Sequence, residues 1–155
     1  IAIPKAGIFV KRWTNDEIRE AAYIRRALEG EAGRLFLQRA SHEDRARLSQ
    51  LSDQFDACIC SDLLRADEVD LEFHLHLVRA TRFPQLYQLV ESSKIQNMTI
   101  WRRSSQTVDY RKLVGCHGPI VQAIWAGDEE GTLRAIWDHF MTVIEGLADI
   151  SQGVH

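Results

Sequence analysis

The sequence predicts an all-α fold, an antiparallel bundle of six or seven helices joined by short loops. Apolar residues recur at helical spacing through the segment 14–150. Short capping and turn signals divide that segment into six stretches of helical length. A strand is expected only in the first residues of the chain, which have a different composition.

Residues 1–10 are rich in β-branched side chains and are interrupted by Pro4 and Gly7. This composition is typical of a strand or hairpin arm. The chain is therefore divided into a segment 1–13 with a short β-strand, a helical domain 14–150, and a tail 151–155. The tail has no apolar pattern and is expected to fray.

The first three helices are expected between recognisable start and stop signals. The first begins at the capping-box sequence Thr14–Glu17 and runs to about Arg39. The second begins at Ser41, and the third begins near Ser61 or Asp62. The third must end before Pro84, because proline disfavours helical backbone at the preceding residue and suits the first turn of a new helix.

The remaining helices follow from similar signals. The fourth is expected from Pro84 to about Arg103, followed by a loop at 104–107. The fifth and sixth flank the short turn 126–128, in which Asp128 can cap the sixth helix. All connections are short, so consecutive helices are expected to run antiparallel.

Charge and composition exclude several classes of function. The 155 residues carry 22 acidic and 19 basic side chains, a formal net charge of −3. Binding nucleic acid through its phosphates needs a clustered excess of Lys and Arg, so this part alone is not expected to bind it. The apolar runs are too short to span a membrane, and we find no secretory leader. Three cysteines without a CxxC pair indicate reduced thiols and a cytoplasmic protein.

Four residues are candidates for a metal site. Asp70 and His74 are four residues apart on the third helix, which places both on one face. His117 and His139 lie ten or so residues on either side of Asp128, so they are expected at equal height on an antiparallel hairpin, about 15 Å from its turn. If the third helix packs against that hairpin, all four side chains can reach one ion.

The donor types limit which ion is possible. Imidazole and carboxylate suit Zn²⁺, our first choice, or Ni²⁺, Mn²⁺ or Fe²⁺. Spacing alone leaves another interpretation open, because an acid and a histidine four residues apart also occur on solvated helices, and His74 can be a core histidine. The other histidines, His42, His76 and His155, are expected at the surface or the chain end.

Several short motifs occur together and in a fixed order. They are Arg25-x-x-Leu28-Glu29, Asp70-Leu-Glu-Phe73-His74, Pro84-x-Leu86, His117-x-x-Ile120-x-x-Ala123-Ile124, Gly127-Asp128 and His139. Together they resemble the C-terminal effector-binding domain (FCD type) of GntR-family transcription regulators, of the FadR/VanR subfamily. The resemblance covers 16–147, and the segment 6–10 is similar to the last strand of the winged-helix wing that precedes such domains.

The resemblance implies a homodimeric, non-catalytic domain that binds a small organic acid. It also implies a signal to an N-terminal winged helix-turn-helix, which binds operator DNA and is mostly absent from this sequence. The family's metal ligands correspond to Asp70, His74, His117 and His139. We expect the acid to coordinate the metal and to contact Arg25.

Further effector contacts are expected from the fourth helix. Its inward stripe is predicted to be Leu86, Val90, Ser93, Asn97 and Ile100. The polar members Ser93 and Asn97 need hydrogen-bond partners if they are buried, and a water-filled pocket beside the metal would supply them. Arg103 is the last candidate. If the stripe is rotated instead, Ser93 and Asn97 face solvent.

Two other functions stay open at this point, a metal-dependent hydrolase and a metal-free helical dimerisation module. A hydrolase needs a general base near a metal-bound water, and no further acid or histidine falls at a ligand position. The sequence departs from the family pattern at Cys116, where an acidic residue is usual. It departs again at Gly118-Pro119, which is expected to start the fifth helix late or kink it.

Overall fold

The computed structural model of the chain describes residues 15–93 and 110–152. These residues form six α-helices and one 3-10 helix, in the order α1 (Asn15–Arg39), α2 (His42–Cys58), α3 (Leu63–Arg79), helical residues 84–93, η1 (Tyr110–Leu113), α5 (Gly118–Ala126) and α6 (Glu129–Gln152). The all-α prediction is confirmed. The strand expected within 1–13 and the end of the fourth helix lie outside the described residues.

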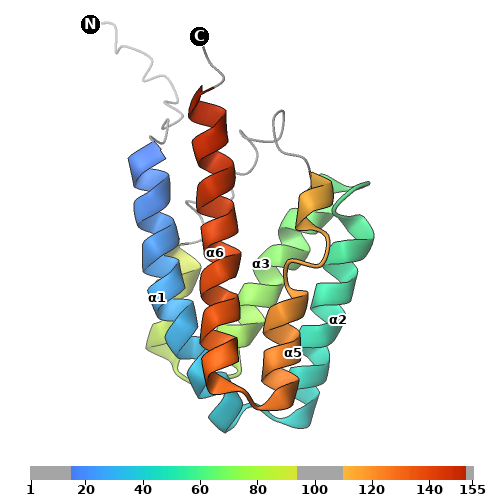
Figure 1. Cartoon of the computed structure of the whole chain (residues 1–155). Helices are drawn as coiled ribbons and strands as arrows, with labels where there is room; N and C mark the ends of the chain where they lie inside the picture. Colours follow the sequence, from blue (N-terminus) through green and yellow to red (C-terminus); the bar gives the residue numbers. More distant parts are fainter. Residues whose placement is uncertain (1–14, 94–109, 153–155) are drawn as a thin grey trace, which may run out of the picture.

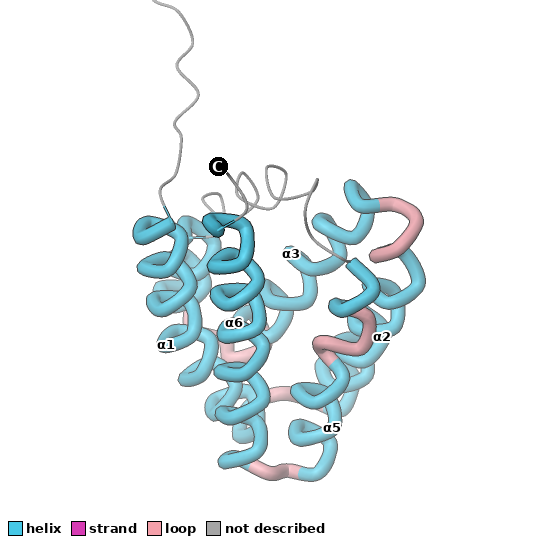
Figure 2. The backbone as a smooth tube through the Cα atoms, turned by 45° about the horizontal axis from the view of Figure 1, so that its top comes forward, coloured by secondary structure: helices cyan, strands magenta, loops and turns pink. Residues whose placement is uncertain are grey.

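The helices form two groups joined by α3. In Figure 1, α1 and α6 run antiparallel side by side, and α5 leads into α6 through a tight turn. Figure 2 shows α1 and α6 on one side, α2 and α5 on the other, and α3 between them. Because α3 packs against both α1 and α2, its side chains can be buried on more than one face.

Local capping fixes where the helices begin. Ser41 and Asp44 form a capping box at α2, in which the Ser41 hydroxyl accepts from the Asp44 N–H at 3.1 Å and the Asp44 carboxylate accepts from the Ser41 N–H at 2.9 Å. Asp62 caps α3 in a similar way. At the start of α6, the Asp128 carboxylate accepts from the Gly131 N–H at 2.9 Å. These three predicted starts are confirmed.

The apolar core draws on nearly every helix. Its largest fully buried apolar members are Phe36, Leu48, Leu51, Ile59, Phe73, Leu77, Ile120, Ile124 and Ile136. Gly33 allows α1 to lie close to α6, because a Cβ at this position would come within 2.5 Å of the Ile136 side chain. Val90 packs with Ala32 and Val78, so the predicted inward orientation of Val90 is confirmed.

Two details differ from the sequence-based expectations. His76 was expected at the surface, but it is buried, and its Nε2 lies 2.9 Å from the backbone oxygen of Asp44. The helix α6 includes Ser151 and Gln152, which were assigned to the patternless tail. Burial of His76 follows from the central position of α3, which leaves few of its faces open to solvent.

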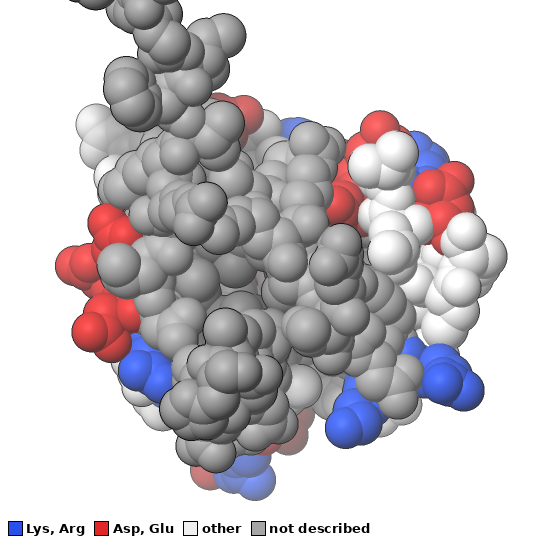
Figure 3. All heavy atoms as spheres, turned by 90° about the horizontal axis from the view of Figure 1, so that it is seen from above, with Lys and Arg blue, Asp and Glu red and all other residues white. Residues whose placement is uncertain are grey.

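The surface agrees with a mixed charge pattern. Seen from above, acidic and basic side chains both lie around the edge of the described residues (Figure 3). Among the described helices, none combines the length and apolar character needed to cross a membrane.

Candidate metal centre

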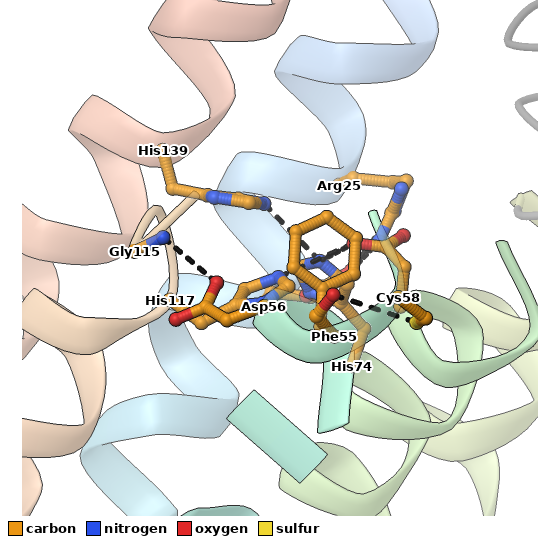
Figure 4. A network of polar contacts seen from close by, with 10 residues as sticks. Arg25, Phe55, Asp56, Cys58, His74, Gly115, His117 and His139 are labelled. Carbon is orange, nitrogen blue, oxygen red and sulfur yellow. Dashed lines mark hydrogen bonds and ion pairs between the residues drawn. The ribbon is translucent and has the colours of Figure 1, made fainter. Parts of the chain in front are cut away.

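The four predicted ligands come together in the middle of the bundle, and Figure 4 shows the three histidines among them. One ligand atom from each of Asp70, His74, His117 and His139 lies within 4.8 Å of the others. Asp70 Oδ1 is 3.2 Å from His117 Nε2 and 3.5 Å from His74 Nε2. The Nε2 atoms of His74 and His139 are 3.2 Å apart.

Three elements place these side chains. Asp70 and His74 are one turn apart on α3, and His139 lies on α6. His117 is the residue directly before α5, whose first turn contains Pro119. Gly118-Pro119 was expected to start the fifth helix late or to kink it. In the structure α5 starts at Gly118, directly after His117. The α5–α6 hairpin brings the His117 and His139 ring centroids to 4.9 Å from each other.

The spacing of the ligand atoms fits one shared ion. With metal–ligand bonds of about 2.0–2.2 Å, neighbouring ligand atoms of one ion are about 3.0–3.5 Å apart. The three separations of 3.2, 3.5 and 3.2 Å lie in this range. Three of the six pairs of ligand atoms therefore have the spacing that one first-row transition metal ion gives its ligands, and all six pairs lie within 4.8 Å.

His117 supplies independent support for this fit. Its side chain is fully buried, and within the described residues neither ring nitrogen has a hydrogen-bond partner. Asp70 Oδ1 is close to Nε2 but is not aligned for a hydrogen bond. Phe73 stacks on the ring at 4.1 Å between centroids, and Phe55 contacts it edge-on at 4.7 Å. Buried nitrogens normally have partners, and a metal ion would be one for Nε2.

The environment also favours the protonation states that bind metal. Burial lowers the pKa of His117, and it lowers that of His139 well below its usual value, with help from the neighbouring imidazoles. Burial alone would raise the pKa of Asp70, but the nearby His74 and His117 imidazoles outweigh this and hold it well below its usual range. Two neutral imidazoles and an ionised carboxylate result, and these forms can ligate a metal.

Behind the ligands lies a residue that sequence reasoning missed as a site residue. Glu29 on α1 is completely buried, and its Oε2 lies 2.5 Å from His74 Nδ1. Arg25 donates to Glu29 Oε1 from Nε at 2.9 Å and from Nη2 at 2.7 Å. The sequence offered one signal for this pair: Glu29 follows Arg25 by four residues, so both lie on one face of the helix. That face also carries Ala32, which is buried.

Comparison with known proteins identifies the fold and the family. The FCD domain family matches residues 20–142. The chain belongs to the FCD domain family. This confirms the resemblance to the effector-binding domain of GntR-type regulators.

A curated relative and a solved structure are similar to this FCD domain. The chain is 28% identical over 152 residues to the "probable D-xylose utilization operon transcriptional repressor" of Paenarthrobacter nicotinovorans. The match covers 96% of the chain and 66% of that relative, so the chain spans about two thirds of its length. The E. coli McbR/YncC structure has the same fold, with a TM-score of 0.85, 18% identity, and coverage of 96% of this chain and 76% of that one.

The named relative is described as a transcriptional repressor, and the FCD match supports a regulatory role. Accordingly, the FCD domain is a regulatory domain and not an enzyme, as the sequence predicted.

The structure describes two of the four residues that were predicted to contact the effector. Arg25 is buried; its guanidinium binds Glu29 and lies 4.8 Å from the Phe140 ring centroid. The Ser93 hydroxyl donates to the backbone oxygen of Val90 at 2.7 Å. Asn97 and Arg103 lie outside the described residues. Contact of these four side chains with an effector stays a prediction.

The cluster of four candidate ligands in the FCD domain is more accessible from one side. The side chains of His74 and His117 are 2% and 0% exposed, whereas that of Asp70 is 24% exposed and His139 is half-buried. Cys116, which stands where the family usually has an acid, is next to the site. Burial raises the pKa of its thiol, so the thiol stays protonated and is a poor metal ligand.

Proposed function

We propose that this FCD domain binds a divalent transition metal through Asp70, His74, His117 and His139 and senses a small organic acid at that metal. The observation that carries the proposal is the convergence of four ligand atoms within 4.8 Å. The ion would supply the positive charge to which an effector carboxylate binds. The protein side chains hold the ion and leave it approachable beside Asp70.

The ligand types support a borderline metal ion. Three imidazoles and one carboxylate suit Zn²⁺ first, and Ni²⁺, Mn²⁺ or Fe²⁺ as alternatives. An ion that accepts five or six ligands keeps positions for a carboxylate after the four side chains have bound. The greater exposure of Asp70 and His139 supports entry of the acid from their side.

The regulatory consequence follows from differential binding. We propose that the domain acts as a homodimer and is joined to an N-terminal winged helix-turn-helix that binds operator DNA. An acid that prefers one arrangement of the helices would shift the population toward that arrangement, and with it the spacing of the two DNA-binding heads. Family membership and the relative's description as a transcriptional repressor support this role.

Metal titration tests the first half of the proposal. The purified chain, stripped of metal with a chelator, is titrated with Zn²⁺, Ni²⁺, Mn²⁺ and Fe²⁺ by calorimetry. We expect one ion per chain and loss of binding in His117→Ala and His139→Ala. His42→Ala is the matched control, because His42 is exposed and its ring contacts Trp125 away from the four ligands. No binding by any ion would contradict the proposal and favour the metal-free module.

Effector titration tests the second half. Organic acids are added to the metal-loaded and the metal-free chain while the fluorescence of Trp125 or Trp137 is followed. We expect a response to at least one acid that requires the metal. D-Xylose is included because the relative's description names it. A response to D-xylose alone would contradict an acid effector, and steady turnover of an ester or phosphate would favour the hydrolase.

A further inference from the structure

We propose that Glu29 is a positioning residue of the metal centre, which fixes the tautomer of His74 so that its Nε2 faces the ion. This inference rests on the proposed function. It also makes α1, which carries no ligand, a part of the centre. Neither the family match nor the ligand motif assigns this role to Glu29.

The contact between Glu29 and His74 determines where the imidazole proton lies. Glu29 Oε2 is 2.5 Å from His74 Nδ1, and an ionised carboxylate can only accept hydrogen bonds. Nδ1 of a neutral His74 must therefore carry the proton. The lone pair is then on Nε2, which lies 3.5 Å from Asp70 Oδ1 and 3.2 Å from His139 Nε2, among the other ligand atoms.

Arg25 holds Glu29 in the required form. A buried carboxylate without a partner is costly, and Glu29 is completely buried. The Arg25 Nε and Nη2 groups both donate to Oε1, which leaves Oε2 for His74. Each oxygen of the carboxylate thus has a different task, and both are needed to fix the imidazole.

The position of α1 gives this contact a wider consequence. The helix packs against α3, which carries Asp70 and His74, and against α6, which carries His139 (Figure 1). Glu29 therefore links α1 to the centre through a charged hydrogen bond as well as through apolar packing. Occupation of the centre by metal would strengthen the docking of α1.

The substitution Glu29→Gln separates positioning from packing, because it preserves size and removes one acceptor oxygen. Arg25 has no acceptor role, so it will take the single amide oxygen, and the amide NH₂ will face His74 Nδ1. His74 is then driven to the Nε2–H tautomer, which has no lone pair toward the ion. Partners of ligating histidines typically contribute about 10–100-fold to metal affinity, so we expect zinc affinity to fall by that factor.

The double variant Arg25→Met, Glu29→Gln supplies the rescue. Without Arg25 the amide can turn, so that its oxygen accepts from His74 Nδ1 again. We expect part of the zinc affinity and the original tautomer to return. Glu31→Gln is the matched control, because Glu31 lies two residues further along α1, is exposed, and pairs with Arg34 at the surface. It should bind zinc as tightly as the unaltered chain.

Nitrogen-15 NMR of the metal-free chain reads the tautomers directly, at a pH of about 8, where imidazoles are neutral. We expect Nδ1–H at His74 in the unaltered chain, Nε2–H in Glu29→Gln, and no change at His117. Nε2–H at His74 in the unaltered chain would overturn the proposal, whether or not any variant folds. Weaker zinc binding without a tautomer change or rescue would also overturn it. Absence of zinc binding in the unaltered chain would instead defeat the proposed function.

Discussion

Two regions of the bundle both contain fully buried side chains but are chemically opposite. Phe36 and Leu48, in the apolar core, are 0% exposed, and so are Glu29 and His117, in the polar centre. Full burial of a large apolar side chain stabilises a fold by about 1.5–3 kcal/mol. Buried charged groups add little net stability, because losing water offsets what they gain from their partners. The apolar region therefore holds the fold together, and we propose that the polar region serves metal binding.

The comparison predicts its largest effect on stability in the apolar region. Phe36→Ala removes a completely buried ring, and we expect it to lower the free energy of unfolding by about 3–5 kcal/mol. Denaturant unfolding measures this loss. Zinc affinity of the folded chain should stay unchanged, because the Phe36 ring packs edge-on against His76, which is not one of the four ligands. Loss of zinc binding in a folded Phe36→Ala chain would contradict the claim that the apolar core and the polar centre have separate roles.

In the polar region, the main effect on the free energy of unfolding should come from bound zinc. Zinc at about 100 times its dissociation constant should raise the free energy of unfolding by about 2.7 kcal/mol. If His117→Ala weakens zinc affinity about 100-fold, the same zinc concentration should add only about 0.4 kcal/mol. Thermal unfolding with and without zinc checks both values. Equal stabilisation of the two chains would mean that zinc binds elsewhere.

Acid should also weaken the polar region. The pKa values of His117 and His139 are lowered in the folded chain, mainly by burial, from an unfolded value near 6.5. Below that pH the unfolded chain takes up more protons than the folded one, so stability is full above about pH 6.5 and falls as the pH drops toward the folded pKa values. Asp70, whose pKa is also lowered, adds a loss of the same sign at more acidic pH.

Urea unfolding of the metal-free chain between neutral and mildly acidic pH measures this slope. In His139→Gln the slope should be shallower, since one of the depressed groups is gone. A stability that rises on acidification would contradict the assigned burial of neutral imidazoles.

The smallest effect is expected at the surface. Arg134 and Glu130 form an ion pair at 2.6 Å on α6, with side chains 66% and 84% exposed. Arg134→Gln should lower stability by about 0.3–0.5 kcal/mol, as for other exposed pairs one helical turn apart. Thermal unfolding at low and high salt checks this, because the difference should vanish at high salt.

Local signals predicted most of the fold. The residues Ser41, Asp62 and Asp128 marked helix starts because capping depends on neighbours in the chain. His117 and His139 were predicted together because a hairpin relates positions at equal distance from its turn. Each of these inferences needs only distances along the sequence.

The parts that depend on how helices cross could not be predicted in the same way. His76 was expected at the surface because it lies off the face of His74, but α3 is packed on more than one side. The contact of Arg25 with an effector stays a prediction, but its ion pair with Glu29 on the same helix was not expected. Which histidine Glu29 reaches depends on the packing of α1 against α3, and no sequence spacing encodes that packing directly.

X-ray absorption spectroscopy of the zinc-loaded chain tests the central claim most directly. We predict a first shell of nitrogen and oxygen only, at about 2.0–2.1 Å, with the outer scattering of three imidazoles. Binding through Cys116 would place sulfur at about 2.3 Å instead. Two results would contradict a centre built from Asp70, His74, His117 and His139. One is a sulfur ligand. The other is a first shell with fewer than three imidazoles that stays unchanged in His117→Ala and His139→Ala.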